Sequence, residues 1–197
     1  MKRFSAIFLF SVLATILFVL AANAKTSYAM DVDGQLLARA RFALSCLEAK
    51  DWDRLAGVIH PHDGIVFSPY AYVEEDAVKL NAEEVSQLGA GEKIYVWGTY
   101  DGSGEPVELS FIDYYRRFVY DKDFMNALEV AANSLIRTGN TESNLGEVFE
   151  ADDEFVEFHC PGEGPHADFE WASLRIVFRN YRGTWYVVGV VHDGWTI

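Results

Sequence analysis

The C-terminal residues carry the most regular hydrophobic pattern in the chain. From Ser173 to Asn180, apolar and polar residues alternate, which predicts a strand with one apolar face. The run from Trp185 to Val191 is apolar on both faces, which is typical of a central strand covered on both sides. A short polar segment with Gly183 separates the two runs, so we expect a β-hairpin at the centre of a sheet.

The register of this hairpin decides which side chains share a face. If Asn180 pairs with Thr184, one face holds Leu174, Ile176, Phe178, Tyr186, Val188, Val190 and His192. The other face then holds Arg175, Val177, Arg179, Trp185, Val187, Gly189 and Val191. A slip of one residue would exchange these partners.

The N-terminal part predicts helices. A helix capped by Asp31 or Asp33 runs to about Lys50, and Asp51 caps a shorter one that ends before Pro61. The first helix has one apolar face, made of Leu36, Leu37, Ala40, Ala43, Leu44 and Leu47.

Shorter elements are expected between the helices and the hairpin. Strands are predicted at 64–73, interrupted at Pro69, at 93–100 and at 155–159. Helical segments are predicted at 76–88, with a capping-box pattern of Asn81 and Glu84, from Ser110, which forms a second capping pattern with Asp113, and from 139 towards 149. Residues 124–135 fit a helix or a strand. The order predicts an α+β domain, residues 25–197, in which N-terminal helices pack on a curved antiparallel sheet that can close into a cone around a cavity.

The first residues have the pattern of a targeting signal. Lys2 and Arg3 precede an apolar run at 4–20, and Ala22-Asn23-Ala24 is a small-x-small cleavage site. We expect a signal peptide at 1–24 and a periplasmic or secreted protein; the alternative is a membrane anchor, for which the apolar run is slightly short.

The net charge limits the classes of binding partner, and the two cysteines limit the possible disulfides. The net charge is −14, and becomes −16 without Lys2 and Arg3, which argues against nucleic acid and, after signal cleavage, against an anionic membrane surface. Cys46 and Cys160 permit one disulfide in an oxidising compartment, or remain two buried thiols. The oligomeric state stays open.

Two resemblances follow from longer segments. The opening D-W-D-R-L-A at 51–56 and the closing R-N-Y-R-G-T-W-Y-V-V-G-V-V-H-D at 179–193 resemble the cone-shaped NTF2-like (SnoaL-like) fold. A larger set resembles a family of uncharacterised secreted bacterial proteins: H-P-H-D-G-I-V-F-S-P-Y-A-Y-V at 60–73, W-G-T-Y-D-G-S-G-E-P at 97–106, F-V-Y-D-K-D-F at 118–124, G-N-T at 139–141 and H-D-G-W-T-I at 192–197. The second resemblance implies no activity, and the NTF2-like fold hosts both enzymes and binding modules.

Few residues suggest catalysis. His60, His62 and Asp63 form a compact polar group, yet their spacing is not that of a metal site, and we expect neither metal nor cofactor. The sequence has no G-x-S-x-G elbow, no phosphate-binding loop and no H-E-x-x-H. His60 or His192 with Asp113 is the candidate acid-base pair, against a structural role for each histidine.

An aromatic set suggests a binding pocket. Tyr72, Trp97 and Tyr114 could surround a cavity with Arg175 or His192 at its rim, or could simply be core. We therefore expect an exported module that binds a small, partly apolar molecule or a partner. The alternative is a small-pocket hydrolase or isomerase that uses a His/Asp pair.

Overall fold

The computed structural model describes residues 34–196. The chain divides into two units, Met1–Leu37 and Ala38–Ile197. The predicted signal peptide, its cleavage site and the expected caps Asp31 and Asp33 lie outside the described residues. Within the described range, none of the helices has the length and apolar content that crossing a bilayer would require.

The fold is α+β, as predicted, with helices packed against a sheet. The first described helix occupies residues 34–49, and its Ala40, Ala43, Leu44 and Leu47 are fully buried. The other helical elements are α2 (Trp52–Ala56), α3 (Ala82–Ser86), α4 (Phe111–Phe118), α5 (Leu145–Val148) and the 3₁₀ turns η1 (Phe124–Asn126) and η2 (Gly164–His166). The caps read from the sequence are present: the side chains of Asp51, Asn81 and Ser110 each accept a backbone N–H of the first turn.

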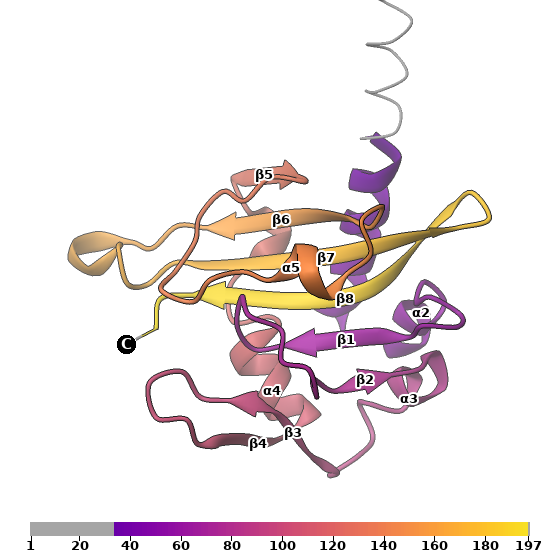
Figure 1. Ribbon diagram of the computed structural model, residues 1–197, viewed down its shortest axis with the longest axis horizontal. Coiled ribbons are helices and arrows are strands. Elements are labelled where there is room, and N and C mark those ends of the chain that lie inside the picture. Colours follow the sequence, from indigo (N-terminus) through magenta and orange to yellow (C-terminus); the bar gives the residue numbers. More distant parts are fainter. Residues whose placement is uncertain (1–33, 197) are drawn as a thin grey trace, which may run out of the picture. The chain divides into compact units, whose positions relative to one another are not determined.

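Six strands form the main sheet, in the order β2-β1-β8-β7-β6-β5 (Figure 1). These strands are β1 (Ile65–Ser68), β2 (Lys79–Leu80), β5 (Glu129–Ala132), β6 (Glu154–Cys160), β7 (Ala172–Tyr181) and β8 (Thr184–Gly194). A separate hairpin joins β3 (Ile94–Thr99) and β4 (Pro106–Ser110). The sheet is mixed rather than wholly antiparallel, because β1 runs parallel to β8.

The C-terminal hairpin is central in the sheet, as its apolar pattern predicted. Its turn contains two residues, Arg182 and Gly183, both with positive φ (54° and 82°), and Tyr181 lies opposite Thr184. Positive φ at both central positions gives a turn whose twist suits the flanking strands. The pairing of Asn180 with Thr184 is therefore wrong by one residue.

A β-bulge then restores the predicted faces along most of the hairpin. Val177 pairs with Gly189 and Phe178 with Val187, so Val188 is the extra residue. Beyond the bulge, Leu174 lies opposite His192, so the two share a face as predicted, although the predicted register pairs Leu174 with Val190. Between the bulge and the turn the faces are exchanged, because Tyr186 now lies opposite Arg179.

The two faces of the sheet are covered by different parts of unit 2. Figure 1 shows α5 in front of β7 and β8, and α4 behind β1. Phe67 of β1 packs against Trp97, Phe111 and Tyr114 on the α4 side. Val66 points the opposite way, to a cluster with Val73, Leu145, Val177, Val188 and Val191.

Some local predictions need correction. Residues 76–88 hold the short strand β2 and a helix that begins only at Ala82, and residues 124–135 hold η1 and β5. The helix expected from residue 139 begins at Leu145.

The predicted disulfide is absent, because Cys46 and Cys160 are both free. Cys46 is fully buried in the first described helix, whereas the Sγ of Cys160, at the end of β6, lies 3.7 Å from the carbonyl oxygen of Asp123. Burial raises the pKa of the Cys160 thiol to about 11, so it is scarcely ionised at neutral pH. Each thiol therefore sits in its own packed environment.

Candidate functional site

A cavity of about 550 Å³ opens on the α5 side of the sheet. Its apolar floor is formed by Val66, Val73, Ala77, Phe149 and Val188. Its charged side chains are Asp63, Glu74, Glu75, Lys79, Glu147 and Arg179, and Tyr72 and Val148 also line it. The cavity thus combines an apolar body with polar groups, the usual make-up of a small-molecule site.

Two local features of β8 create the floor. The bulge leaves Val188 unpaired and turns its side chain to the cavity side. The next residue, Gly189, lies under the ring of Phe149, and a Cβ there would come within 2.6 Å of Phe149 Cζ. Glycine at position 189 therefore allows Phe149 to lie directly on the sheet.

The two walls of the cavity are tied together. Val73 donates its N–H to Asn144 Oδ1 (2.8 Å), and Asn144 Nδ2 donates to the Val73 carbonyl (3.0 Å). Glu74 Oε1 accepts from the backbone N–H (2.8 Å) and hydroxyl (2.7 Å) of Thr99 in β3. The loop after β1 is thus fixed to α5 on one side and to β3 on the other.

Arg179 of β7 stands at one end of the cavity among three carboxylates. It binds Asp153 through Nε (2.8 Å) and Nη2 (2.6 Å), and its Nη1 lies 3.0 Å from Asp63 and 2.9 Å from Glu150. These bonds, first of all that to Asp153, raise the pKa of Arg179. Its guanidinium therefore already binds three carboxylates from two segments of the chain, residue 63 and residues 150–153.

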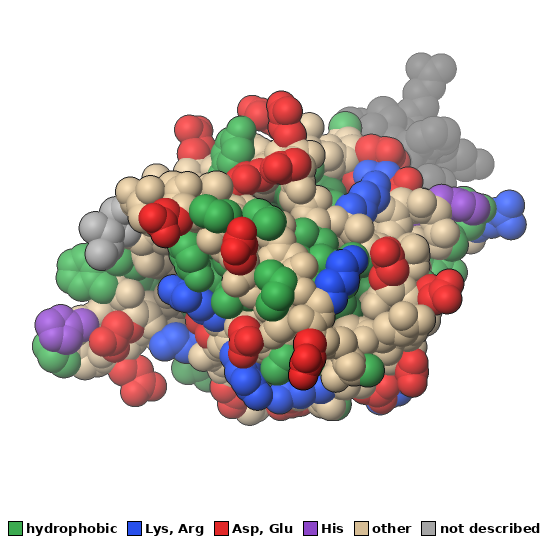
Figure 2. Space-filling model, turned by 90° about the horizontal axis from the view of Figure 1, so that it is seen from below, with side chains coloured by type: hydrophobic (Ala, Val, Ile, Leu, Met, Phe, Trp, Pro, Cys, Tyr) green, Lys and Arg blue, Asp and Glu red, His purple; other side chains and the backbone are tan. Residues whose placement is uncertain are grey.

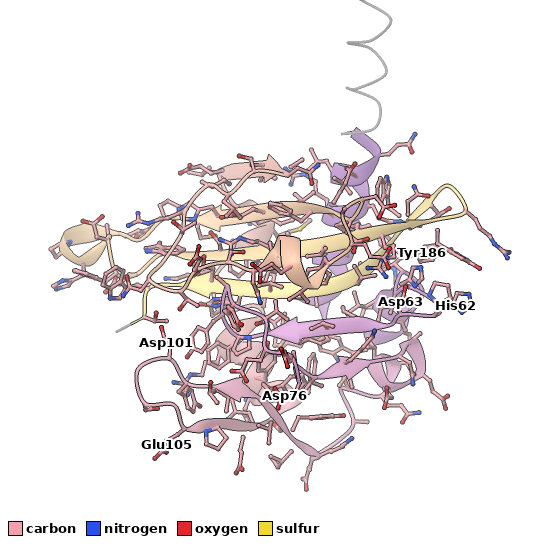
Figure 3. All side chains as sticks on the ribbon, viewed as in Figure 1. His62, Asp63, Asp76, Asp101, Glu105 and Tyr186 are labelled. Atoms are coloured by element: carbon pink, nitrogen blue, oxygen red, sulfur yellow. The ribbon has the colours of Figure 1, made fainter. Side chains whose placement is uncertain are left out.

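The group His60, His62 and Asp63 is brought together beside this arginine. His60 Nδ1 lies 2.9 Å from Asp63 Oδ2 and 3.0 Å from the Asp63 backbone N–H, so it donates to the first or accepts from the second, depending on its tautomer. His62 Nε2 lies 3.1 Å from the hydroxyl of Tyr181. Figure 3 shows His62, Asp63 and Tyr186 at the same end of the molecule, near the β7–β8 turn.

Of this group, Asp63 faces the cavity. His60 is buried, with 4% of its surface exposed, and packs edge-on against Tyr181 and Tyr186. It is not among the side chains that line the hollow. His60 therefore contacts Asp63 from the side that faces away from the cavity.

The other candidate acid-base residues lie apart from this cavity. His192 bonds Asp121 (3.2 Å) and the Pro69 carbonyl (3.2 Å), and it is buried. Asp113 is exposed and accepts from Ser110 at the start of α4. The predicted partnership of His192 with Asp113 is thus replaced by one with Asp121.

The five predicted ligand-binding residues are not gathered around one pocket. Tyr72 is half exposed and lines the cavity. Trp97 and Tyr114 are fully buried and stacked on each other with ring centroids 4.1 Å apart, on the opposite side of the sheet. Trp97 Nε1 donates to the Leu109 carbonyl (3.0 Å), which satisfies its polar edge. These two rings serve the core.

Arg175 is also buried rather than at a rim. Its Nε donates to Glu157 (3.0 Å) and its Nη2 to Asp193 (2.7 Å) and to the Arg137 carbonyl (3.0 Å). All three charged side chains are almost completely inaccessible. Nη1 of Arg175 and Oε1 of Glu157 have no protein partner among the described residues.

A group of acidic side chains lies close to Arg179. Oxygen atoms of Glu150, Asp152 and Asp153 lie within 4.8 Å of one another. Glu150 and Asp153 already bind Arg179, whose positive charge opposes that of a metal ion. We therefore assign Glu150 and Asp153 to binding Arg179 rather than a metal ion.

No protein-family model matches the chain, and no curated protein is detectably similar to it. The resemblances to the NTF2-like fold and to secreted bacterial proteins stay predictions.

Proposed function

We propose that this protein is an exported module that binds a small, partly apolar molecule in the cavity between α5 and strands β1 and β8. The observation that supports this most is the lining of the cavity, in which five apolar side chains form the floor and six charged ones surround it. Its volume of about 550 Å³ lies within the range of pockets that hold small ligands.

The cavity walls are fixed before any ligand arrives. Asn144 and Glu74 hold the loop 72–77 through four hydrogen bonds, and Gly189 lets Phe149 rest on the sheet. A preformed site loses less conformational entropy on binding. This favours binding of a rigid, compact molecule over recruitment of a long peptide.

The alternative of a His/Asp enzyme has less support. The His60–Asp63 pair has the right distance for proton transfer, but His60 does not line the cavity and Asp63 is also bound by Arg179. A general base needs an unobstructed path to the reacting proton. Binding without chemistry therefore remains our proposal.

Export is part of this proposal and has its own test. The apolar run at 4–20 and the site Ala22-Asn23-Ala24 predict cleavage before Lys25. Mass spectrometry of the protein from its native host should find Lys25 at the N-terminus. An intact N-terminus that starts at Met1 would refute the cleavage.

Blocking the cavity tests the binding function. Ala77 lines the hollow and is half-buried, so Ala77→Phe should fill it at a cost of about 1 kcal/mol. A small-molecule panel is screened by thermal shift on the mature protein, because a ligand that binds the native state raises Tm. Hits should stabilise the wild type and the control Ala90→Phe, an exposed position, but not Ala77→Phe. Hits that stabilise all three proteins equally would place binding elsewhere.

A further inference from the structure

We propose that the ligand of this cavity carries a positively charged amine or amidine group on its partly apolar body. This inference rests on the proposed function and adds the charge of the ligand. It follows from the charged side chains that line the cavity and from the ion pairs and hydrogen bonds that each of them already forms.

Arg179 does not offer its charge to a ligand. Asp63, Glu150 and Asp153 bind it, so its positive charge is surrounded by three negative side chains, of which Asp63 lines the cavity. A guanidinium that makes bidentate bonds to one carboxylate and further bonds to two others has little capacity left for an anion. An anionic ligand would have to displace a carboxylate there.

The remaining charged groups are mostly acidic. Within the described residues, Glu74 accepts hydrogen bonds from the neutral groups of Thr99 alone, so its negative charge is not compensated by them. Glu75 and Glu147 are exposed at the rim, and neither forms an ion pair within the described part of the chain. Lys79 is the opposing cation in the lining. Three carboxylates therefore face one ammonium.

The wider surface adds to this field. The chain has a formal net charge of −14, and Figure 2 shows acidic side chains spread over the face in view rather than gathered at one edge. Summed charges of one sign attract ligands of the opposite sign and repel those of the same sign. The field around the cavity therefore favours cations.

The apolar lining fits an organic cation better than a metal ion. Val66, Val73 and Val188 offer no ligand atoms, whereas Tyr72 and Phe149 supply aromatic rings that can receive a cationic head. Within residues 34–196, the carboxylates that converge closely enough for a metal are Glu150, Asp152 and Asp153, and none of them lines the cavity.

Three probes with the same body isolate the charge. Binding of 3-phenylpropylamine, 3-phenylpropanol and 3-phenylpropionate to the mature protein is measured by calorimetry at neutral pH and low salt. We expect the amine to bind about tenfold more tightly than the acid, with the alcohol between them, because several partly exposed charges contribute. The double variant Glu75→Gln/Glu147→Gln should reduce this ratio to about threefold or less, whereas the exposed control pair Glu92→Gln/Glu163→Gln should leave it unchanged.

The outcomes separate the two proposals. If the acid binds as tightly as the amine or more tightly, and Ala77→Phe abolishes both, the cavity is a ligand site and the inference on charge is wrong. If the amine is preferred but the rim variant keeps the full ratio, the assignment to Glu75 and Glu147 is wrong. If none of the three probes binds at millimolar concentration, both the binding function and the charge preference are refuted for ligands of this size.

Discussion

Two arginines on the same face of β7 have opposite surroundings. Arg175 is 0% exposed and shares its charge with Glu157 and Asp193 in the interior. Arg179, four residues further along the strand, is 18% exposed and borders the cavity among Asp63, Glu150 and Asp153. The two arginines occupy equivalent positions in the alternating pattern of β7. Arg175 is nevertheless part of the packed interior, whereas Arg179 lies at the edge of the cavity.

The difference arises from what covers the sheet at each point. Over Arg175 lies the segment after β5, which contributes the Arg137 carbonyl to the guanidinium and the Ile136 N–H to Glu157. Near Arg179 the covering segment consists of the short helix α5 and Phe149, beside which the cavity opens. The contacts made by the covering segment thus decide whether a charged group on this face is buried or accessible.

The largest expected effect is on Arg175. Arg175→Met would leave Glu157 and Asp193 buried without a cation, which costs about 3–5 kcal/mol of unfolding free energy. Urea denaturation measures the loss. The variant that also carries Glu157→Gln and Asp193→Asn should recover part of the stability. A loss below about 1 kcal/mol for Arg175→Met alone would show that this interior is hydrated.

Arg179→Met should cost less, about 2–3 kcal/mol, because water can reach Asp63 and Glu150, although the side chain of its third partner, Asp153, is only 1% exposed. It should also free Asp63, which lines the cavity, and so raise the affinity of the cavity for 3-phenylpropylamine. The same denaturation and calorimetry measurements apply. Equal losses of unfolding free energy for Arg175→Met and Arg179→Met would contradict the claim that Arg175 is buried and Arg179 is accessible to water.

The pH dependence of the unfolding free energy should reflect the burial of Asp193 beside Arg175. Burial raises the pKa of Asp193 above its ordinary value of 3.8, and the nearby Arg175 offsets this only in part. The native state then holds this proton more tightly than the unfolded chain does, so the contribution of Asp193 to stability falls as the pH rises through the interval above 3.8. The difference in unfolding free energy between wild type and Asp193→Asn should therefore decrease as the pH rises. An increase would mean that the pKa is lowered.

The smallest expected effect is that of salt on the unfolding free energy. Salt should change the contribution of Arg179 by a few tenths of a kcal/mol and leave that of Arg175 unchanged. Raising the ionic strength from about 0.01 M to about 1 M shortens the Debye length from about 30 Å to about 3 Å. The stability difference between wild type and Arg179→Met should shrink, because Glu150 and Asp63 are partly exposed. The difference for Arg175→Met should stay constant. A shift of similar size at both positions would contradict the comparison.

Much of the fold could be predicted from local patterns. The hairpin, the caps at Asp51, Asn81 and Ser110, and the apolar face of the first described helix depend on neighbours within a few residues. The bulge at Val188 and the parallel pairing of β1 with β8 depend on distant segments, and the sequence alone gave no signal for either.

The candidate site was harder to predict because it joins residues far apart in the sequence. Tyr72 and the group around Asp63 were recognised, and the structure places them at the cavity or next to it. Glu74, Glu75 and Glu147 were missed, since acidic residues are common on the surface of a chain with net charge −14. Trp97 and Tyr114 are predicted to line a pocket, but both pack in the aromatic core on the other side of the sheet, where the Tyr114 hydroxyl has no hydrogen-bond partner among the described residues.

The most direct test of the account is an NMR titration with 3-phenylpropylamine that follows side-chain N–H signals. The Nε–H of Arg179 donates to Asp153 at the cavity, that of Arg175 donates to Glu157 in the interior, and the indole N–H of Trp97 donates to Leu109 in the aromatic core. We predict that the Arg179 signal and the backbone signals of residues 72–77 and 144–149 shift, while those of Arg175 and Trp97 stay in place. A shift of the Trp97 indole signal with an unchanged Arg179 signal would contradict the proposed site. It would place the ligand on the aromatic side of the sheet instead.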